Sequence, residues 1–339
     1  MIIFLLIVVL LSLYGIRYNA NISSAMTKKD TNVVKGFFLL LVFLSHSTGY
    51  YTYSGELDMP YISIRNMMGQ SVVTFFLFCS GYGVMESIKR NVNYVDSIFK
   101  NRFLKVLFDF DVVVTLFLIT NLLLGNSVSF YNYVLACTAW GGLGNSNWYI
   151  FCILYCYLIT IMAFKLNRYH KTVMSIGGVI ILCLIYILYI KHYKETHWWD
   201  TILCYPLGML FAYYKQQIIA FLESKQHMIY SIVGILMLTL SLYKFKCLII
   251  AKLSLLCLFV LFVVLLMLNL KFENSVLEYI GENLFGFYIL QRIPMMVLKE
   301  TGIVTDRYVF VIVCFLFLLP LNHIVNKGLT YIRSLIFKN

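Results

Sequence analysis

Eighteen consecutive residues, Leu253 to Leu270, read LSLLCLFVLFVVLLMLNL and contain no charged side chain. A helix rises about 1.5 Å per residue, so this stretch is roughly 27 Å long, close to the hydrocarbon thickness of a bilayer. The whole chain has the same character, because 61% of its 339 residues are apolar and only 12% are charged. That leaves too little polar surface for a water-soluble globule. The sequence predicts an all-α polytopic integral membrane protein.

Ten further apolar stretches bring the number of expected transmembrane helices to eleven. The gaps between them are too short for a separate soluble domain. We therefore expect an N-terminal transmembrane helix with a cytoplasmic linker over 1–32, followed by a ten-helix membrane domain over 33–339. The expected spans are 2–18, 33–51, 68–88, 103–124, 148–166, 172–190, 201–214, 227–243, 251–270, 283–298 and 308–332.

The distribution of Lys and Arg predicts the orientation of these spans. No basic residue precedes the first apolar stretch, and Arg17 follows it, which is the reverse of a cleaved signal peptide. With the N-terminus outside, 18 basic residues fall on the inner side and 8 on the outer side, with Arg292 inside a span. This positive-inside bias indicates a plasma-membrane protein whose C-terminus is cytoplasmic, although the loop from Lys244 to Lys252 runs against it.

The net charge of +12 and the nine cysteines raise the questions of nucleic-acid binding and metal binding. The basic residues lie in short loops between apolar blocks, so we expect no nucleic-acid partner. Most cysteines lie inside apolar runs. Cys152 and Cys156 share a helix face, but no histidine or second cysteine pair accompanies them. Soft-metal sites need clustered ligands, so we expect no metal site.

Lys35 and His46 are the first polar pair inside a predicted span, in KGFFLLLVFLSHS. Eleven steps of about 100° return to nearly the same helix face, with an axial separation of about 16 Å. Lys35 would lie at the cytoplasmic mouth and His46 deep in the membrane, where an ionisable residue is a functional candidate. An equally good alternative is a structural histidine bonded between helices, with Lys35 as a topological anchor.

Three further segments place polar or small residues near or within spans. Arg102 and Lys105 face one way at i, i+3 and suit phosphate recognition, although an orienting role alone also explains them. Ser80 and the glycines beside it interrupt an apolar span, which helix packing alone would explain. Gln291 and Arg292 lie deep in a span that Pro294 is expected to kink.

An arginine at that depth needs a counter-charge or water. A structural salt bridge from Arg292 to Asp109 or Asp111 would satisfy it as well as a substrate would. Asp109 and Asp111 are two residues apart and point to different helix faces.

Five segments follow one another in order: Lys35 to His46, Phe75-Phe76 with Ser80-Gly81-Tyr82, Arg102 with Lys105, Trp148-Tyr149-Ile150, and Gly281 with Tyr288 to Gln291. In type and spacing they resemble the acyltransferase 3 family of membrane acyltransferases. The resemblance covers about residues 33–339, where the ten expected spans equal the family's usual number. The chain departs from the family in having Gln291 where histidine is commoner, in lacking a glutamate after the Trp148 motif, and in its extra first helix.

The resemblance implies transfer of an acyl group, usually acetyl, from cytoplasmic acyl-CoA to a hydroxyl of a cell-surface polysaccharide or its lipid-linked precursor. It implies acyl-CoA as co-substrate, the glycan and the bilayer as partners, and no permanently bound cofactor. His46 would be the general base or carry the acyl group. Lys35, Arg102 and Lys105 would hold CoA phosphates. The residues left for substrate or oxyanion contacts are Ser80, Tyr82, Trp148, Tyr288, Gln291 and Arg292.

Two other classes of protein would share some of these features. A transporter or flippase of lipid-linked sugars also needs buried charge, but more often shows inverted repeats and paired broken helices. A polysaccharide polymerase or ligase would be expected to have a large outer loop, and the longest here is about twenty residues. Binding or hydrolysis of acetyl-CoA would distinguish the acyltransferase from both.

Overall fold

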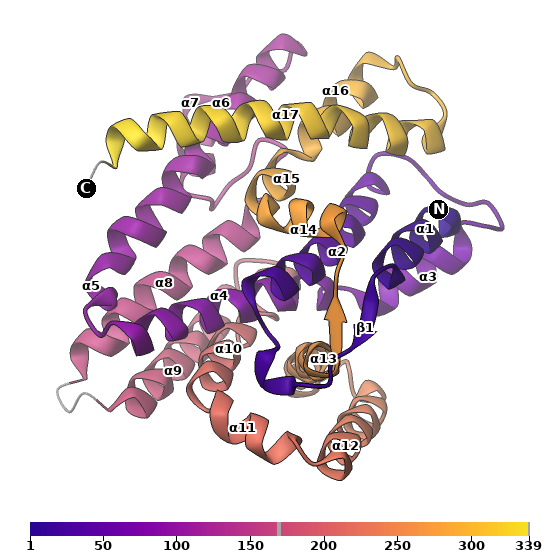
Figure 1. Ribbon diagram of the computed structural model, residues 1–339. Coiled ribbons are helices and arrows are strands. Elements are labelled where there is room, and N and C mark those ends of the chain that lie inside the picture. Colours follow the sequence, from indigo (N-terminus) through magenta and orange to yellow (C-terminus); the bar gives the residue numbers. More distant parts are fainter. Residues whose placement is uncertain (168–170, 338–339) are drawn as a thin grey trace.

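The protein is a helical bundle with a single small two-stranded sheet in the part described by the computed structural model, residues 1–167 and 171–337 (Figure 1). Short 3-10 helices at Ile22–Ser24 and Thr196–Trp198 and a π-helical turn at Phe99–Leu104 complete the regular structure. The main elements are α1 (Ile2–Leu13), β1 (Ile16–Tyr18), α2 (Lys28–Ser47), α3 (Met59–Met68), α4 (Ser71–Arg90), α5 (Tyr94–Ile98), α6 (Lys105–Leu123), α7 (Phe130–Cys137), α8 (Trp148–Leu166), α9 (Thr172–Ile190), α10 (Cys204–Tyr213), α11 (Lys215–Leu222), α12 (Lys225–Tyr243), α13 (Ile249–Asn269), β2 (Leu270–Phe272), α14 (Ser275–Glu282), α15 (Leu284–Leu290), α16 (Arg292–Thr301) and α17 (Arg307–Ile336).

Within the described residues, seven helical stretches are long and apolar enough to cross a bilayer. They confirm the all-α polytopic membrane class. The 20-residue α2 is long enough as well, but its first two turns carry Lys28, Lys29, Asp30 and Lys35. The seven stretches are Met59–Arg90, Tyr94–Leu123, Trp148–Leu166, Thr172–Ile190, Lys225–Tyr243, Ile249–Asn269 and Arg307–Ile336.

The expected first span, 2–18, is not one helix. Helix α1 ends at Leu13 after 12 residues, and Gly15 adopts a left-handed φ of +79°. A side chain at Gly15 would collide with the backbone of Glu273, because the chain turns there into β1, which pairs antiparallel with β2. Strands β1 and β2 lie side by side in Figure 1 and join the N-terminal segment to the end of α13. A helix of 12 residues is only about 18 Å long.

Two other expected spans are also shorter than predicted. In the 201–214 stretch, only Cys204–Tyr213 forms the helix α10. The 283–298 stretch is broken at Gln291 into α15 and α16, three residues before the proline that was expected to kink it. Helices broken at membrane depth are tolerated where the freed backbone is buried in protein or lines a polar cavity.

Helices α4 and α10 cross with their backbones in contact. A Cβ added at Gly81 would overlap the carbonyl oxygen of Tyr205, and one added at Gly208 would overlap that of Phe78. Glycines in membrane helices permit this close approach, which increases dispersion contact between the helices. The crossing fixes the rotation of α4 about its axis and therefore the directions in which Ser80 and Tyr82 point.

Helix α2 crosses α14 in the same way. A Cβ at Gly36 would overlap the carbonyl of Leu277, and a Cβ at Gly281 would overlap that of Asn32. Gly36 directly follows Lys35 in the sequence. Helix α2, which carries Lys35 and His46, and helix α4, which carries Ser80 and Tyr82, are therefore both held by glycine-mediated crossings.

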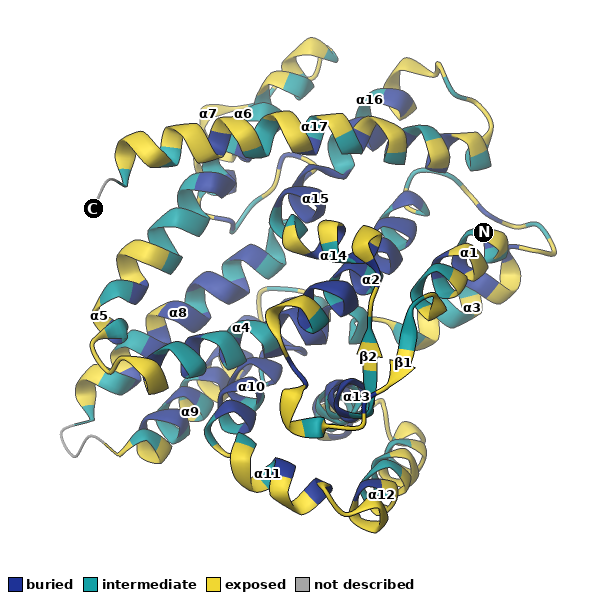
Figure 2. Cartoon of the chain, in the orientation of Figure 1, coloured by how far each residue is buried: buried dark blue, intermediate teal, exposed yellow. Residues whose placement is uncertain are grey.

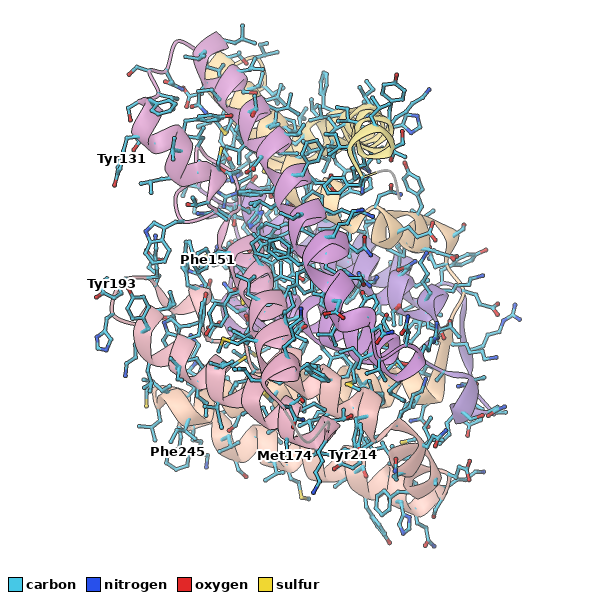
Figure 3. The ribbon with its side chains drawn as sticks, turned by 90° about the vertical axis from the view of Figure 1, so that its left-hand side faces the viewer. Tyr131, Phe151, Met174, Tyr193, Tyr214 and Phe245 are labelled. Atoms are coloured by element: carbon cyan, nitrogen blue, oxygen red, sulfur yellow. The ribbon has the colours of Figure 1, made fainter. Side chains whose placement is uncertain are left out.

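Burial is concentrated in α2, α4, α8 and α10, whereas α12 lies at the periphery and is largely exposed (Figure 2). In the perpendicular view, Tyr131 and Tyr193 point out of the molecule, and Phe151 lies among the helices (Figure 3). The Phe151 ring packs against Trp140 and Trp198 at 5.3 and 5.8 Å. Exposed tyrosines beside apolar spans are typical of a membrane interface.

Ion pairs connect different segments of the chain. In each of the pairs below, the charge distribution assigns both residues to the same side of the membrane. On the side expected to be outer, Lys252 pairs with Asp200 and Arg307 pairs with Asp58. On the opposite side, three further pairs link loops and helix ends: Arg17 to Glu273, Lys29 to Glu278 and Lys165 to Asp96. Arg168 and Lys338, both counted on the inner side, lie outside the described residues. The contacts thus agree with the alternation of sides along the chain.

Cys247 gives a direct test of which side is outer. It is the one exposed cysteine of the nine, and it lies in the α12–α13 loop that runs against the positive-inside bias. We expect a membrane-impermeant maleimide to label it in intact cells, and Cys247→Ser to abolish the labelling. Labelling that appears only after permeabilisation would place this loop in the cytoplasm and reverse the predicted orientation.

The α4–α10 crossing predicts different effects for two neighbouring glycines. Gly81→Ala places a methyl group on the Tyr205 backbone and should lower the free energy of unfolding by about 1–3 kcal/mol. Gly83→Ala is the matched control, because nothing lies within 4 Å of its added Cβ. Thermal unfolding of the detergent-purified variants measures both. Equal midpoints for the two would show that the crossing does not need a glycine at position 81.

Candidate functional site

His46 lies in the last turn of α2, on the same uninterrupted helix as Lys35. The residue is half-buried, and its Nδ1 is buried without a hydrogen-bond partner. Nε2 is therefore the ring nitrogen that remains accessible. In a histidine bonded between helices, the structural alternative, a buried ring nitrogen is expected to have a hydrogen-bond partner.

Tyr288 and Gln291 reach His46 from the break between α15 and α16. Gln291 is fully buried, and its Nε2 donates to the carbonyl of Tyr288 at 2.8 Å. Its Oε1, like the buried hydroxyl of Tyr288, has no partner. The Tyr288 ring lies 6.4 Å from that of His46, and the Gln291 side chain lies beside the imidazole.

Arg292 is the first residue of α16 and acts electrostatically on His46. One terminal nitrogen donates to the carbonyl of Gly144 at 3.4 Å, whereas its Nε is buried without a partner. Asp109 pairs instead with Arg333, at 3.3 Å. Among the described residues no carboxylate forms an ion pair with Arg292, so the structural salt bridge to Asp109 or Asp111 is not formed.

The loop before α8 supplies two polar residues that the sequence analysis missed. Asn145 and Ser146 are each about 5% exposed, yet Asn145 Nδ2 and Ser146 Oγ have no partner. Ser146 lies beside the hydroxyl of Tyr288. No periodicity or charge marks this loop, so nothing in the sequence indicated that it folds onto the site. We call the six residues His46, Asn145, Ser146, Tyr288, Gln291 and Arg292 the histidine cluster.

Arg65 also lies close to this cluster and was not predicted. It projects from α3, and its Nε donates to Ser45 Oγ at 3.0 Å, one residue before His46. Its charge acts on His46 together with that of Arg292. The only sequence signal was a basic residue on the side predicted to be outer.

Trp148 and Ser80 border the histidine cluster. The Trp148 ring meets Tyr149 at 5.9 Å and His197 at 5.7 Å, in edge-to-face geometry. Tyr149 in turn lies 5.5 Å from Tyr288. Ser80 lies beside the hydroxyl of Tyr149, so α4 approaches the cluster at this residue. The structure thus brings Ser80, Trp148 and Tyr288 into one continuous aromatic and polar group.

Lys35 lines a separate pocket of about 640 Å³ at the opposite end of α2. Tyr82 belongs to this pocket, and its hydroxyl accepts a hydrogen bond from Lys215 Nζ at 2.9 Å. Four cations and one acid contribute to the lining, so the pocket suits an anionic ligand. We call it the lysine pocket; its chemically distinctive residues are Lys28, Lys35, Cys79, Tyr82, Glu86, Arg90 and Lys215.

Arg102 and Lys105, predicted to act with Lys35, do not line the lysine pocket. Arg102 lies on the π-helical turn, and its Nε donates to the hydroxyl of Tyr94 at 2.8 Å. Lys105 Nζ lies 5.8 Å from the centre of the Phe337 ring. A π-helical turn inside a longer helix is frequent at functional sites. The structure therefore gives Arg102 an unusual backbone setting but does not place it in the lining of the lysine pocket.

Comparison with known families identifies this arrangement. The acyltransferase-domain family, Acyl_transf_3, matches residues 29–329, which include three of the four cations of the lysine pocket and the whole histidine cluster. The chain belongs to the acyltransferase 3 family. No curated protein and no solved structure matches it.

As a member of the acyltransferase 3 family, the protein is an integral membrane acyltransferase. The match begins at residue 29, inside α2, and leaves α1 and β1 outside the family region. Within that region α2 joins two chemically different sites, one cationic and open to anions, the other rich in unpartnered polar atoms. An acyltransferase needs one site for its donor and one for its acceptor, and α2 carries a candidate for each of the two.

Proposed function

We propose that this acyltransferase moves an acyl group, acetyl in the first instance, from cytoplasmic acyl-CoA to a hydroxyl of a cell-surface polysaccharide or its lipid-linked precursor. The observation that carries the proposal is the geometry of α2. One continuous helix places Lys35 in a basic pocket and His46 among unpartnered polar atoms. Their separation, about 16 Å along the axis, is close to the length of a pantetheine arm.

The lysine pocket is the proposed donor site. Lys35, Arg90 and Lys215 offer ammonium and guanidinium groups to CoA phosphates, and charge-assisted contacts of this kind are the stronger class of hydrogen bond. The orientation in which the C-terminus is cytoplasmic puts this pocket on the cytoplasmic side of the plasma membrane, where acyl-CoA is available. The thioester would then extend along α2 toward His46.

The histidine cluster is the proposed reaction centre. His46 Nε2 takes the proton of the acceptor hydroxyl as that oxygen attacks the thioester carbonyl. The tetrahedral oxyanion accepts hydrogen bonds from the Tyr288 hydroxyl and the second N–H of the Gln291 amide. The carbon–sulfur bond then breaks, and the proton on His46 passes to the CoA thiolate. Trp148 and Arg292 orient the acceptor, since both lie where the cluster meets the outer loops.

Replacement of the donor-site cation gives the first test. Lys35→Ala should weaken binding of acetyl-CoA to the purified protein by about 1–3 kcal/mol, the scale of one charge-assisted contact. Arg102→Ala is the informative comparison, because Arg102 was predicted to bind the same phosphates but lies outside the pocket. Calorimetry or fluorescence titration in detergent measures both variants. Unchanged affinity in Lys35→Ala would remove the lysine pocket as the donor site.

Two substitutions of His46 distinguish a general base from a structural residue. His46→Ala and His46→Gln should each abolish acyl transfer while leaving acetyl-CoA binding intact, because neither side chain can accept the proton. A structural histidine would tolerate glutamine, which keeps a hydrogen-bonding group of similar reach, far better than alanine. Acyl transfer to surface glycans in cells is the measurement, with thermal stability as the control. Substantial transfer by His46→Gln would overturn the mechanism.

A further inference from the structure

Two guanidinium groups lie near His46, and they come from helices far apart in the sequence. Arg65 projects from α3 and Arg292 from α16, and both act electrostatically on the imidazole. Each is only partly engaged. Arg65 uses its Nε for Ser45, which leaves both terminal nitrogens without a bond to any described residue, and Arg292 Nε has no partner at all. Neither forms an ion pair within residues 1–167 and 171–337.

The protein's own buried acids on this side cannot neutralise them. Asp58 is bound to Arg307 and to the hydroxyl of Tyr308, at 3.3 and 3.0 Å. Burial opposes its ionisation, but hydrogen bonds from the N-terminal ammonium, the Tyr308 hydroxyl and the backbone N–H of Gly55 keep the pKa of Asp58 below its usual value. Asp200 is held by Lys252 at 2.9 Å. Two like charges beside one partly buried imidazole are unfavourable without an anion between them.

Several uncharged groups next to the two guanidiniums are ready to bind a sugar. Gln291 Oε1, Ser146 Oγ and Asn145 Nδ2 are buried, and none has a partner. His197, beside Trp148, adds no further charge at neutral pH, since burial lowers its pKa despite the adjacent Glu195. The site therefore combines two positive charges with hydroxyl and amide groups that can form hydrogen bonds with a carbohydrate.

We propose that the acceptor carries an anionic group, a carboxylate or a phosphate, which Arg65 and Arg292 bind while its hydroxyl meets His46. This inference rests on the proposed function and names the chemical class of its acceptor. The CoA phosphates do not supply the anion, because the lysine pocket that would hold them is about 16 Å away along α2. Arg65 is thus a specificity-determining residue and selects acidic or phosphorylated sugars over neutral ones.

Matched sugars test the proposal on the full-length protein in phosphatidylcholine nanodiscs. Methyl glucuronoside and methyl glucoside differ at C6, where one has a carboxylate and the other a hydroxymethyl group, and glucose 1-phosphate offers a phosphate. We expect at least one anionic sugar to bind about tenfold or more tightly than methyl glucoside. Arg65→Gln and Arg292→Gln should each reduce this preference, and Arg65→Lys should retain part of it. Lys299→Gln is the matched control, because Lys299 is an exposed cation on α16 that lies over the Tyr51 ring.

The outcomes separate this inference from its alternatives. Equal affinities for the neutral and anionic sugars, or a preference that survives both arginine substitutions, would overturn it. Dihexanoyl phosphatidic acid, a soluble lipid phosphate, is the competitor. If it binds more tightly than either anionic sugar and depends on Arg65, the guanidiniums bind a bilayer headgroup and the inference fails. Acetyl-CoA affinity, measured on the same samples, tests the proposed function separately, since it depends on the other end of α2.

Discussion

Backbone contact between helices, permitted by four glycines, is the constraint on which the rest of the site depends. Gly36 and Gly281 bring α2 against α14, and Gly81 and Gly208 bring α4 against α10. Apolar side chains alone give little preference for one helix register over another inside a bilayer, because lipid is equally apolar. Contacts between backbones are different, since a helix that slides or rotates loses them at once. They fix the register of α2, and this register sets where Lys35 and His46 lie.

The break at Gln291 follows from the same environment. Ending α15 at Leu290 frees backbone groups that have no water to bind, which is costly at membrane depth. The Gln291 side chain meets part of that need by donating to the carbonyl of Tyr288. The break also turns α16 so that Arg292 approaches the loop at Gly144. One amide side chain thus stabilises a local distortion and brings a cation and a phenol to the histidine.

The features that could be predicted from the sequence were those carried by one helix or by composition. The membrane class follows from uninterrupted apolar runs, and the relation of Lys35 to His46 follows from helical periodicity within α2. Three features depend on contacts between distant segments, and the periodicity of the sequence carries no information about such contacts. They are the strand β1, the shortened α10 and the exact point at which the 283–298 stretch breaks. Arg65 and Ser146 were missed for the same reason, because each lies in a segment whose position only tertiary packing determines. Arg102 lies on a π-helical turn that no residue pattern indicated, and it does not line the lysine pocket.

The two ends of α2 share a positive charge but differ in what surrounds it. At Lys35 the cations line an open pocket, whereas at His46 two guanidiniums stand beside unpartnered amide and hydroxyl groups. If both substrates are anionic, their charges would be about 16 Å apart, where unit charges repel by only about 1 kcal/mol at an effective dielectric constant of 20. Each contact with its own cation outweighs that repulsion. The length of α2 would therefore let two negatively charged substrates bind together, with the uncharged thioester and hydroxyl meeting at the histidine.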